Sequence, residues 1–405
     1  MAAHNSRPLT NTASVTAAAI AGVAGTREPD SKTIGGAFDL IPGITRRAAH
    51  ALKRKAIIRL GLVSDQKFYL DSAIVKPRGD VERIALHSDA VDLEFTLPAD
   101  GSKARNSYRP RFVYGIADAT VDAISNLVYD RNGQFIAESS SWLAMRQLYS
   151  WPSPQTRPPR ARWSGEFIFL PTNGYYHWLV EDLPVFLKSL HVAPNAKVLL
   201  PRNARSYVRE VAELLSNEVI EISGKVRVER LVMTAKTGGV GSPFGGLTPH
   251  PADVAILREC FARHLSGHPG NRKLYLTRVG QKRSPANERV LQSRMERQGF
   301  ESFDGSSMSV ASQAALFSSA AQVVGMHGAA FANLVWAPLG IDVTEMFSSA
   351  YMPACYSALT AIARGAYACW AYVPGNGDVI DEDTIERLSS AVLRPQQIIS
   401  SVGLR

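Results

Sequence analysis

The feature that most constrains the fold is a regular alternation of short apolar runs with amphipathic stretches. The runs of strand length are residues 166–170, 197–200, 230–234, 273–277, 322–325 and 342–347. Between most of them, apolar residues recur at the spacing of a helix. Strands that alternate with helices form parallel sheets through right-handed connections. We therefore expect an α/β protein with two Rossmann-like domains that face a cleft, where ligands bind beyond the carboxyl ends of the strands.

The first third of the chain has a different pattern, with strand-like segments and a hairpin signal at Asn132-Gly133. A proline-rich stretch at 151–160 and a glycine-rich stretch at 237–246 mark two boundaries. These features divide the chain into five predicted parts. They are a mobile leader (1–40), a basic helix with a β-rich region (41–150), a first Rossmann-like domain (151–245), a second Rossmann-like domain (246–375) and a C-terminal helical tail (376–405).

Composition and charge exclude several classes of protein. With 405 residues, 45% of them hydrophobic and 20% charged, the chain is neither largely disordered nor fibrous. Its three cysteines form no disulfide framework or zinc pair, which favours a reducing compartment. No stretch has the ~18 consecutive apolar residues that span a bilayer, so we expect a cytoplasmic protein. The net charge of +9 suits phosphate-bearing small molecules or the surface of an anionic membrane, and no nucleic-acid-binding motif is present.

The first candidate for chemistry is the segment 173–184, NGYYHWLVEDLP. His177 and Glu181 are four residues apart, so a helix through both would place them on one face. An imidazole beside a carboxylate can remove a proton from an alcohol. Glu181 or Asp182 could equally be the base, with His177 orienting the acceptor. Pro184 leaves a further alternative, in which His177 lies on a loop and Asp182 only caps the following helix.

The second candidate is the segment 323–333, VVGMHGAAFAN, which reads as a buried strand, a tight turn and the start of a helix. The amide groups and the dipole of such a helix favour an anion at the turn. Gly328 and Ala329 leave room for a diphosphate, and His327 could donate to a phosphate oxygen. The segment lacks the glycine pattern of dinucleotide-binding proteins. The alternative is a turn that only packs the helix against the strand.

Further polar residues follow the ends of neighbouring strands. Arg278 ends one strand and Arg283 precedes a helix, and guanidinium groups can bind phosphate through two parallel hydrogen bonds. Glu345, at the end of another strand, could accept hydrogen bonds from ribose hydroxyls or cap the next helix. The acidic triplet 381–383 could hold Mg²⁺ or Mn²⁺, but we favour the alternative, because acidic residues are common in a first helical turn.

Taken together, these segments resemble glycosyltransferase family 61, including its bacterial members linked to capsular polysaccharide synthesis. The matching segments, in the order of the family, are 175–184, 274–278 with Arg283 and 287–288, 313–320, 323–333 and 343–345. The resemblance extends from roughly residue 110 to residue 375. Ser284 departs from the pattern, since many members carry a second arginine there.

The resemblance implies a GT-B fold and the inverting transfer of a hexose or pentose from a nucleotide-sugar to a hydroxyl of a polysaccharide or other glycan. It also implies that residues 151–245 form the acceptor domain, that residues 246–375 form the donor-binding domain, and that no metal or other cofactor is needed. The residues expected to be catalytic are His177, Glu181 and Asp182. The residues expected to bind the donor are Arg278, Arg283, Asn287, His327, Gly328, Ala329, Asn333 and Glu345. Two alternatives stay open, namely another polysaccharide-modifying transferase, such as a pyruvyl transferase, and a non-catalytic carbohydrate-binding protein.

Overall fold

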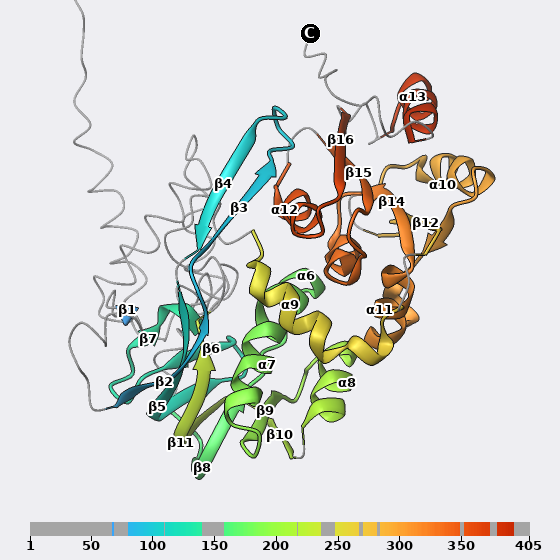
Figure 1. Cartoon of the computed structure of the whole chain (residues 1–405). Coiled ribbons are helices and arrows are strands. Elements are labelled where there is room, and N and C mark those ends of the chain that lie inside the picture. Colours follow the sequence, from blue (N-terminus) through green and yellow to red (C-terminus); the bar gives the residue numbers. More distant parts are fainter. Residues whose placement is uncertain are drawn as a thin grey trace, which may run out of the picture. The chain divides into compact units, whose positions relative to one another are not determined.

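The computed structural model describes residues 67–68, 80–108, 110–139, 158–216, 218–235, 248–266, 270–281, 284–348, 352–372 and 379–392 (Figure 1). Apart from residue 158, all of them belong to one compact unit. The predicted leader, the basic helix and the glycine-rich linker lie outside the described residues. Within the described ranges, no helix combines the length and the apolar character that a membrane crossing requires.

The first sheet combines a parallel part with an antiparallel part. Its strands are β1 (Lys67–Phe68), β2 (Val81–Ser88), β5 (Arg111–Asp122), β6 (Leu127–Tyr129), β7 (Phe135–Ile136), β8 (Arg162–Phe169), β9 (Lys197–Pro201), β10 (Val219–Ile222) and β11 (Lys225–Thr234). Strands β11, β8, β9 and β10 pair in parallel in that order, while β5 pairs with β11 in the antiparallel sense. The predicted hairpin at Asn132-Gly133 is confirmed, since it joins β6 to β7. Strands on both sides of the predicted boundary at 151–160 therefore share one sheet.

One continuous helical stretch connects β8 to β9. It consists of α6 (Tyr175–His177), a π-helical turn η3 (Trp178–Asp182) and α7 (Leu183–Val192). Pro184 lies in the first turn of α7, where its missing N–H does least harm to the helix. The prediction of a helix through His177 is confirmed, and the alternative that His177 lies on a loop is wrong. The next helix, α8 (Ser206–Leu215), connects β9 to β10.

The second sheet is entirely parallel. Its strands are β12 (Arg272–Leu276), β13 (Glu301–Phe303), β14 (Ala320–Met326), β15 (Asp342–Ser348) and β16 (Ala366–Tyr372). The connecting helices are α10 (Glu288–Arg297), α11 (Val310–Ser318), η6 (Ala329–Trp336) and α12 (Cys355–Ile362), and α13 (Glu382–Val392) follows. Residues 329–336, predicted to be helical, form a 3₁₀ helix.

The strand order β13-β12-β14-β15-β16 fixes where this sheet can bind a ligand. From β12 the chain passes to β13 on one side, and the later strands are added on the other side. Doubly wound sheets bind ligands at such a reversal, beyond the carboxyl ends of the two strands concerned. Those strands are β12 and β14, and the residues that follow them are Arg278 and His327.

A single hydrophobic cluster joins the two sheets. It includes Ile168 and Val198 from the first sheet and Leu276 and Val323 from the second. Trp178 of the π-helical turn η3 belongs to the same cluster. Helix α9 (Pro251–Cys260) packs against both α7 and η6. The predicted GT-B arrangement, with its cleft between two domains, stays a prediction.

A hairpin from the first third of the chain, β3 (Val91–Thr96) and β4 (Lys103–Tyr108), covers helix α12 (Figure 1). Leu93 and Phe95 of the hairpin form a small apolar cluster with Ala358 of α12. The Ser357 hydroxyl also donates to the carbonyl of Thr96 at 2.6 Å. Helix α12, which connects two strands of the second sheet, is therefore covered by residues that precede it by more than two hundred positions.

A buried ionic cluster fixes α9 to the first sheet. Asp253 of α9 accepts from the Arg111 guanidinium at 2.5 Å and from the Lys188 ammonium, and all three side chains are buried. His250, one residue before α9, accepts through Nδ1 from the Ala252 amide at 3.0 Å. Burial, reinforced by the positive charge of Arg111, lowers the pKa of His250 to about 3. The folded state therefore keeps His250 neutral.

Replacement of Gly325 by alanine should destabilise the protein. An added Cβ would lie 2.7 Å from both the Cβ atom and the carbonyl oxygen of Leu276 on the paired strand β12. Overpacking of this kind typically costs about 1–3 kcal/mol. Urea unfolding should show this loss for Gly325→Ala but not for Gly174→Ala, where an added Cβ meets no atom within 4 Å. Equal stability of the two variants would contradict the close approach of β12 and β14.

The neutral state of His250 predicts a loss of stability in acid. Unfolding raises its pKa from about 3 to the ordinary value of 6.5, so the unfolded state binds more protons between these values. Stability should therefore fall as the pH drops from 6.5 towards 3, with a slope that approaches about 1.4 kcal/mol per pH unit for one group. Urea unfolding at several pH values should show a shallower dependence for His250→Asn, which keeps a capping acceptor. The same change at the exposed His191 should leave the slope as it is.

Candidate functional site

His177 and Glu181 form the first half of the candidate site. The Nδ1 atom of His177 lies 3.0 Å from Oε1 of Glu181, as the four-residue spacing predicts. The side chain of His177 is 21% exposed and that of Glu181 is 8% exposed. The carboxylate can therefore orient the imidazole from inside the protein, while the imidazole is the part that a substrate could reach.

Asp182 has a different environment. Its carboxylate accepts from the side-chain amide of Asn173, and the residue is buried. Asp182 stands at the N-cap position of α7, but its side chain makes no capping hydrogen bond. The alternative that Asp182 only caps this helix is therefore wrong, and its carboxylate instead fixes the loop after β8. Whether it is catalytic stays a prediction.

Arg278 and the turn after β14 form the second half of the site. The guanidinium of Arg278 donates to the carbonyl oxygen of His327, and its backbone amide donates to Glu288 at 2.6 Å. Gly328 has extended backbone with a φ of −177°, so it is not required for unusual backbone geometry. A Cβ on this residue would lie 3.0 Å from the Arg278 guanidinium. Gly328 therefore provides the space in which Arg278 reaches the turn.

His327 is held by two other strands of the sheet. Its Nδ1 atom lies 2.5 Å from Oε1 of Glu345, and the Tyr367 hydroxyl donates to Oε2 of the same carboxyl group at 2.7 Å. The ring of His327 also stacks on Phe347, with centroids 5.2 Å apart. Burial raises the pKa of Glu345, and the hydrogen bonds from His327 and Tyr367 oppose this increase. Both oxygens of Glu345 thus have partners, and its predicted contact with the nucleoside stays a prediction.

A row of aromatic rings connects the two halves. The ring centroids of His177 and Tyr176 are 5.3 Å apart, those of Tyr176 and Tyr356 are 5.5 Å apart, and those of Tyr356 and His327 are 5.4 Å apart. Helix α6 also packs against η6. The two motifs are therefore neighbours in one unit, although 149 positions separate their histidines. Tyr356, on α12, was not among the predicted site residues.

Of the remaining predicted donor-binding residues, Asn333 and Asn287 form hydrogen bonds with partners other than Arg278 and His327. The amide of Asn333 accepts from the Tyr175 hydroxyl and donates to Gln313, both at 2.9 Å. The amide of Asn287 bonds both the carbonyl and the N–H of Ile380. Ala329 begins η6, and Arg283 lies outside the described residues. The roles predicted for these four residues in donor binding stay predictions.

The acidic triplet 381–383 precedes and begins α13, where Glu382 pairs with Arg294 at 2.5 Å. In the part of the chain that the structure describes, no three histidine, cysteine or acidic side chains form a cluster able to hold a metal ion. Metal-independent transfer stays a prediction.

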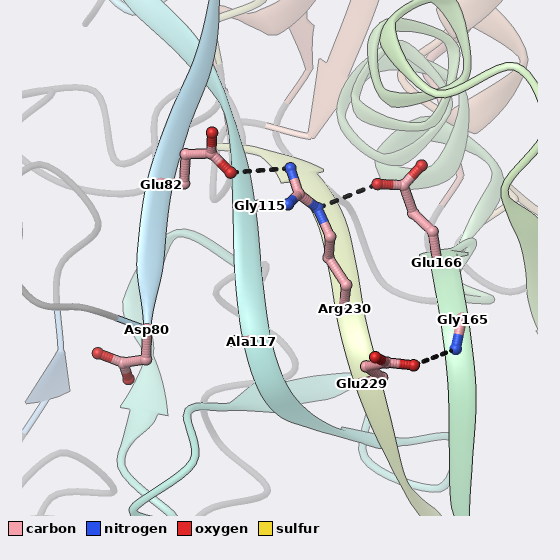
Figure 2. Close-up of a pocket in the computed structure, with 8 residues that line it drawn as sticks. All are labelled: Asp80, Glu82, Gly115, Ala117, Gly165, Glu166, Glu229 and Arg230. Carbon is pink, nitrogen blue, oxygen red and sulfur yellow. Dashed lines mark hydrogen bonds and ion pairs between the residues drawn. The ribbon is translucent and has the colours of Figure 1, made fainter.

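A pocket of about 360 Å³ lies elsewhere, on the first sheet (Figure 2). Its polar lining consists of Asp80, Glu82, Glu166, Glu229 and Arg230. Arg230 binds Glu82 at 2.9 Å and Glu166 at 3.0 Å, and Figure 2 shows it between these two carboxylates. None of the predicted site residues lines this pocket. Its four carboxyl groups are unsuited to a diphosphate, so we do not assign the donor to it.

Residues 175–344, from the first residue of α6 to the third residue of β15, match a family of glycosyltransferases, so this part of the chain is similar to that family. The matching family model is described as Glycosyltransferase 61, which confirms the resemblance found in the sequence. A search of curated proteins finds no match. The matched segment contains His177, Arg278 and His327 but ends one residue before Glu345.

The contact between Gly328 and Arg278 can be tested by stability measurements. Gly328→Ala should cost about 1 kcal/mol, at the lower end of overpacking effects, because the Arg278 side chain can move by a few tenths of an ångström. In an Arg278→Ala background the same change should cost nothing, since the crowded atoms are absent. Chemical unfolding of the wild type, the two single variants and the double variant gives the coupling free energy between Gly328 and Arg278. Additive effects would show that Gly328 does not serve Arg278.

Proposed function

We propose that the protein is an inverting glycosyltransferase that moves a sugar from a nucleotide-sugar to a hydroxyl of a polysaccharide or other glycan. One observation carries this proposal. The His177–Glu181 pair is connected by three ring contacts to His327, which follows one of the two strands at the reversal of the second sheet. The candidate base and the candidate anion site therefore both lie in the segment that matches the glycosyltransferase family.

On the acceptor side, His177 is the base that we favour. It is the most exposed of the three predicted catalytic residues, whereas Glu181 and Asp182 are buried. The imidazole takes the proton of the acceptor hydroxyl while the hydroxyl oxygen forms its bond to the anomeric carbon. Glu181 holds the ring and stabilises the imidazolium that forms. General base catalysis of this kind contributes about 10²- to 10⁴-fold to the rate.

On the donor side, the bond between the anomeric carbon and the phosphate oxygen breaks as the acceptor attacks from the opposite face. The bonding electron pair goes to the leaving nucleoside diphosphate, so negative charge grows there. Arg278 and His327, together with the start of η6 at Gly328, are placed to stabilise this charge. A single well-placed donor is worth about 3 to 4 kcal/mol in such a site. Arg278 would supply positive charge there, and His327 and the amides at the start of η6 would supply hydrogen bonds.

We also propose an acceptor class and a cellular location. The acceptor is a bacterial capsular or other surface polysaccharide, and the location is the cytoplasm, where nucleotide-sugars serve as donors. The net charge of +9 supports contact with an anionic membrane surface at which such acceptors are extended. The GT-B arrangement belongs to the same proposal and is supported by the two α/β sheets.

Two variants test the assignment of roles. A thermal-shift screen of nucleoside diphosphates and nucleotide-sugars first identifies the donor, because a ligand that binds the folded state raises its melting temperature. With that donor, His177→Ala should lower kcat by about 10²- to 10⁴-fold and leave the affinity for the nucleoside diphosphate nearly unchanged. Arg278→Ala should lower kcat by about 10²- to 10³-fold and should also weaken nucleoside diphosphate binding.

Matched controls lie on the same helical stretch as His177 and on the strand that precedes Arg278. His191→Ala changes an exposed histidine in the last turn of α7, and Arg272→Ala changes an exposed arginine at the amino end of β12. Both should transfer sugar at the wild-type rate. Wild-type rates in His177→Ala and Arg278→Ala would refute the site. Stabilisation by phosphoenolpyruvate and not by any nucleotide would instead support the pyruvyl transferase alternative.

A further inference from the structure

We propose that Glu345 is a positioning residue for His327, acting from beneath the donor site with Tyr367 as its support. The inference rests on the proposed function, because it gives His327 the task of binding the donor diphosphate. It assigns Glu345 a role that differs from the predicted contact with nucleoside hydroxyls.

Exposure separates the two partners. The side chain of Glu345 is 0% exposed, whereas that of His327 is 15% exposed. A ligand arriving at the strand ends therefore reaches the imidazole and not the carboxylate. The 2.5 Å contact between Nδ1 of His327 and Oε1 of Glu345 transmits the effect of the carboxylate to the ring.

The geometry leaves the His327 ring little freedom. Phe347 stacks on it at an interplanar angle of 21°, and Tyr356 contacts it with centroids 5.4 Å apart. The backbone is held as well, since the His327 amide donates to the Met346 carbonyl at 2.8 Å and the His327 carbonyl accepts from Arg278. Stacking fixes the plane of the ring but not which of its two edges faces Glu345. The contact of Nδ1 with Glu345 selects one of these two orientations.

Tyr367 explains how a carboxylate can be buried at this place. An unpaired buried charge is strongly unfavourable, so it needs hydrogen bonds from its surroundings. The Tyr367 hydroxyl donates to Oε2 at 2.7 Å, and His327 engages Oε1. The three residues come from three neighbouring strands of the sheet: His327 directly follows β14, Glu345 lies on β15 and Tyr367 lies on β16. Charged and titratable groups nearby include Arg278 at the turn. Cys355 on α12 and Cys369 on β16 both interact electrostatically with Glu345.

The test compares Glu345→Gln, His327→Gln and the double variant for binding of the nucleoside diphosphate found in the screen. Glu345→Gln should weaken binding by about tenfold, as expected for loss of a hydrogen bond to a charged group. In the His327→Gln background the same change should have almost no effect, because Glu345 acts through the ring. Asp342→Asn, an equivalent change at the amino end of β15, is the matched control and should bind as wild type does. Tyr367→Phe should give a smaller loss than Glu345→Gln.

A measurement without ligand keeps this inference distinguishable from the proposed function. The Nδ1 proton of His327, assigned by its absence from the proton NMR spectrum of His327→Gln, should appear far downfield in the wild type. It should move upfield in Glu345→Gln, since an amide is a weaker acceptor than a carboxylate. Two results would overturn the positioning role while the proposed function stands, provided that the wild type binds nucleotide. One is that the effects of Glu345→Gln and His327→Gln on binding are additive, and the other is that the Nδ1 proton of His327 does not shift in Glu345→Gln. If the wild type binds no nucleotide although the proton moves, the donor role of both residues is overturned with the proposed function.

Discussion

The candidate donor site depends on the pairing of β12 with β14. These two strands are adjacent although β13 lies between them in the sequence, and their carboxyl ends carry Arg278 and His327. The pairing is close enough that Gly325 has no room for a Cβ beside Leu276. An interaction between two backbones thus decides whether a guanidinium and an imidazole meet at one point. The hydrogen bond from Arg278 to the His327 carbonyl is possible only because this register holds.

The acceptor half depends on the same packing from the other side. The helical stretch from α6 to α7 presents His177 and Glu181 at one end and buries Trp178 in the cluster shared by both sheets. The π-helical turn ends directly before α7, and the helical stretch continues through Pro184 to Val192. Tyr176 and Tyr356 then fill the distance between the two histidines. The two halves are therefore positioned by side-chain packing within a single compact unit and not only by their strands.

Local patterns in the sequence were sufficient for much of the fold and for the first contact of the site. The spacing of His177 and Glu181 predicts their 3.0 Å contact because a helical turn alone brings them together. The alternation of apolar runs likewise predicts the parallel sheets, and Asn132-Gly133 predicts a hairpin. The roles of Tyr356 and Tyr367 could not be predicted in this way. Tyr356 lies on α12, which packs against η6, and Tyr367 lies on β16, which pairs with β15. The order of strands in a sheet is not written in any local pattern. The alternation in the segment 366–372, AYACWAY, was the available signal for the last strand.

The hairpin β3–β4 limits where a shortened fragment of this protein can begin. Leu93 and Phe95 shield the outer surface of α12, the same helix that presents Tyr356 to the His327 ring. A fragment that starts at the matched segment would leave this apolar surface open to water and invite self-association. A stable fragment must therefore include this hairpin, which lies outside the segment that matches the family. A shorter fragment would keep every residue of the candidate site but would lose the packing that holds α12 and Tyr356 in place.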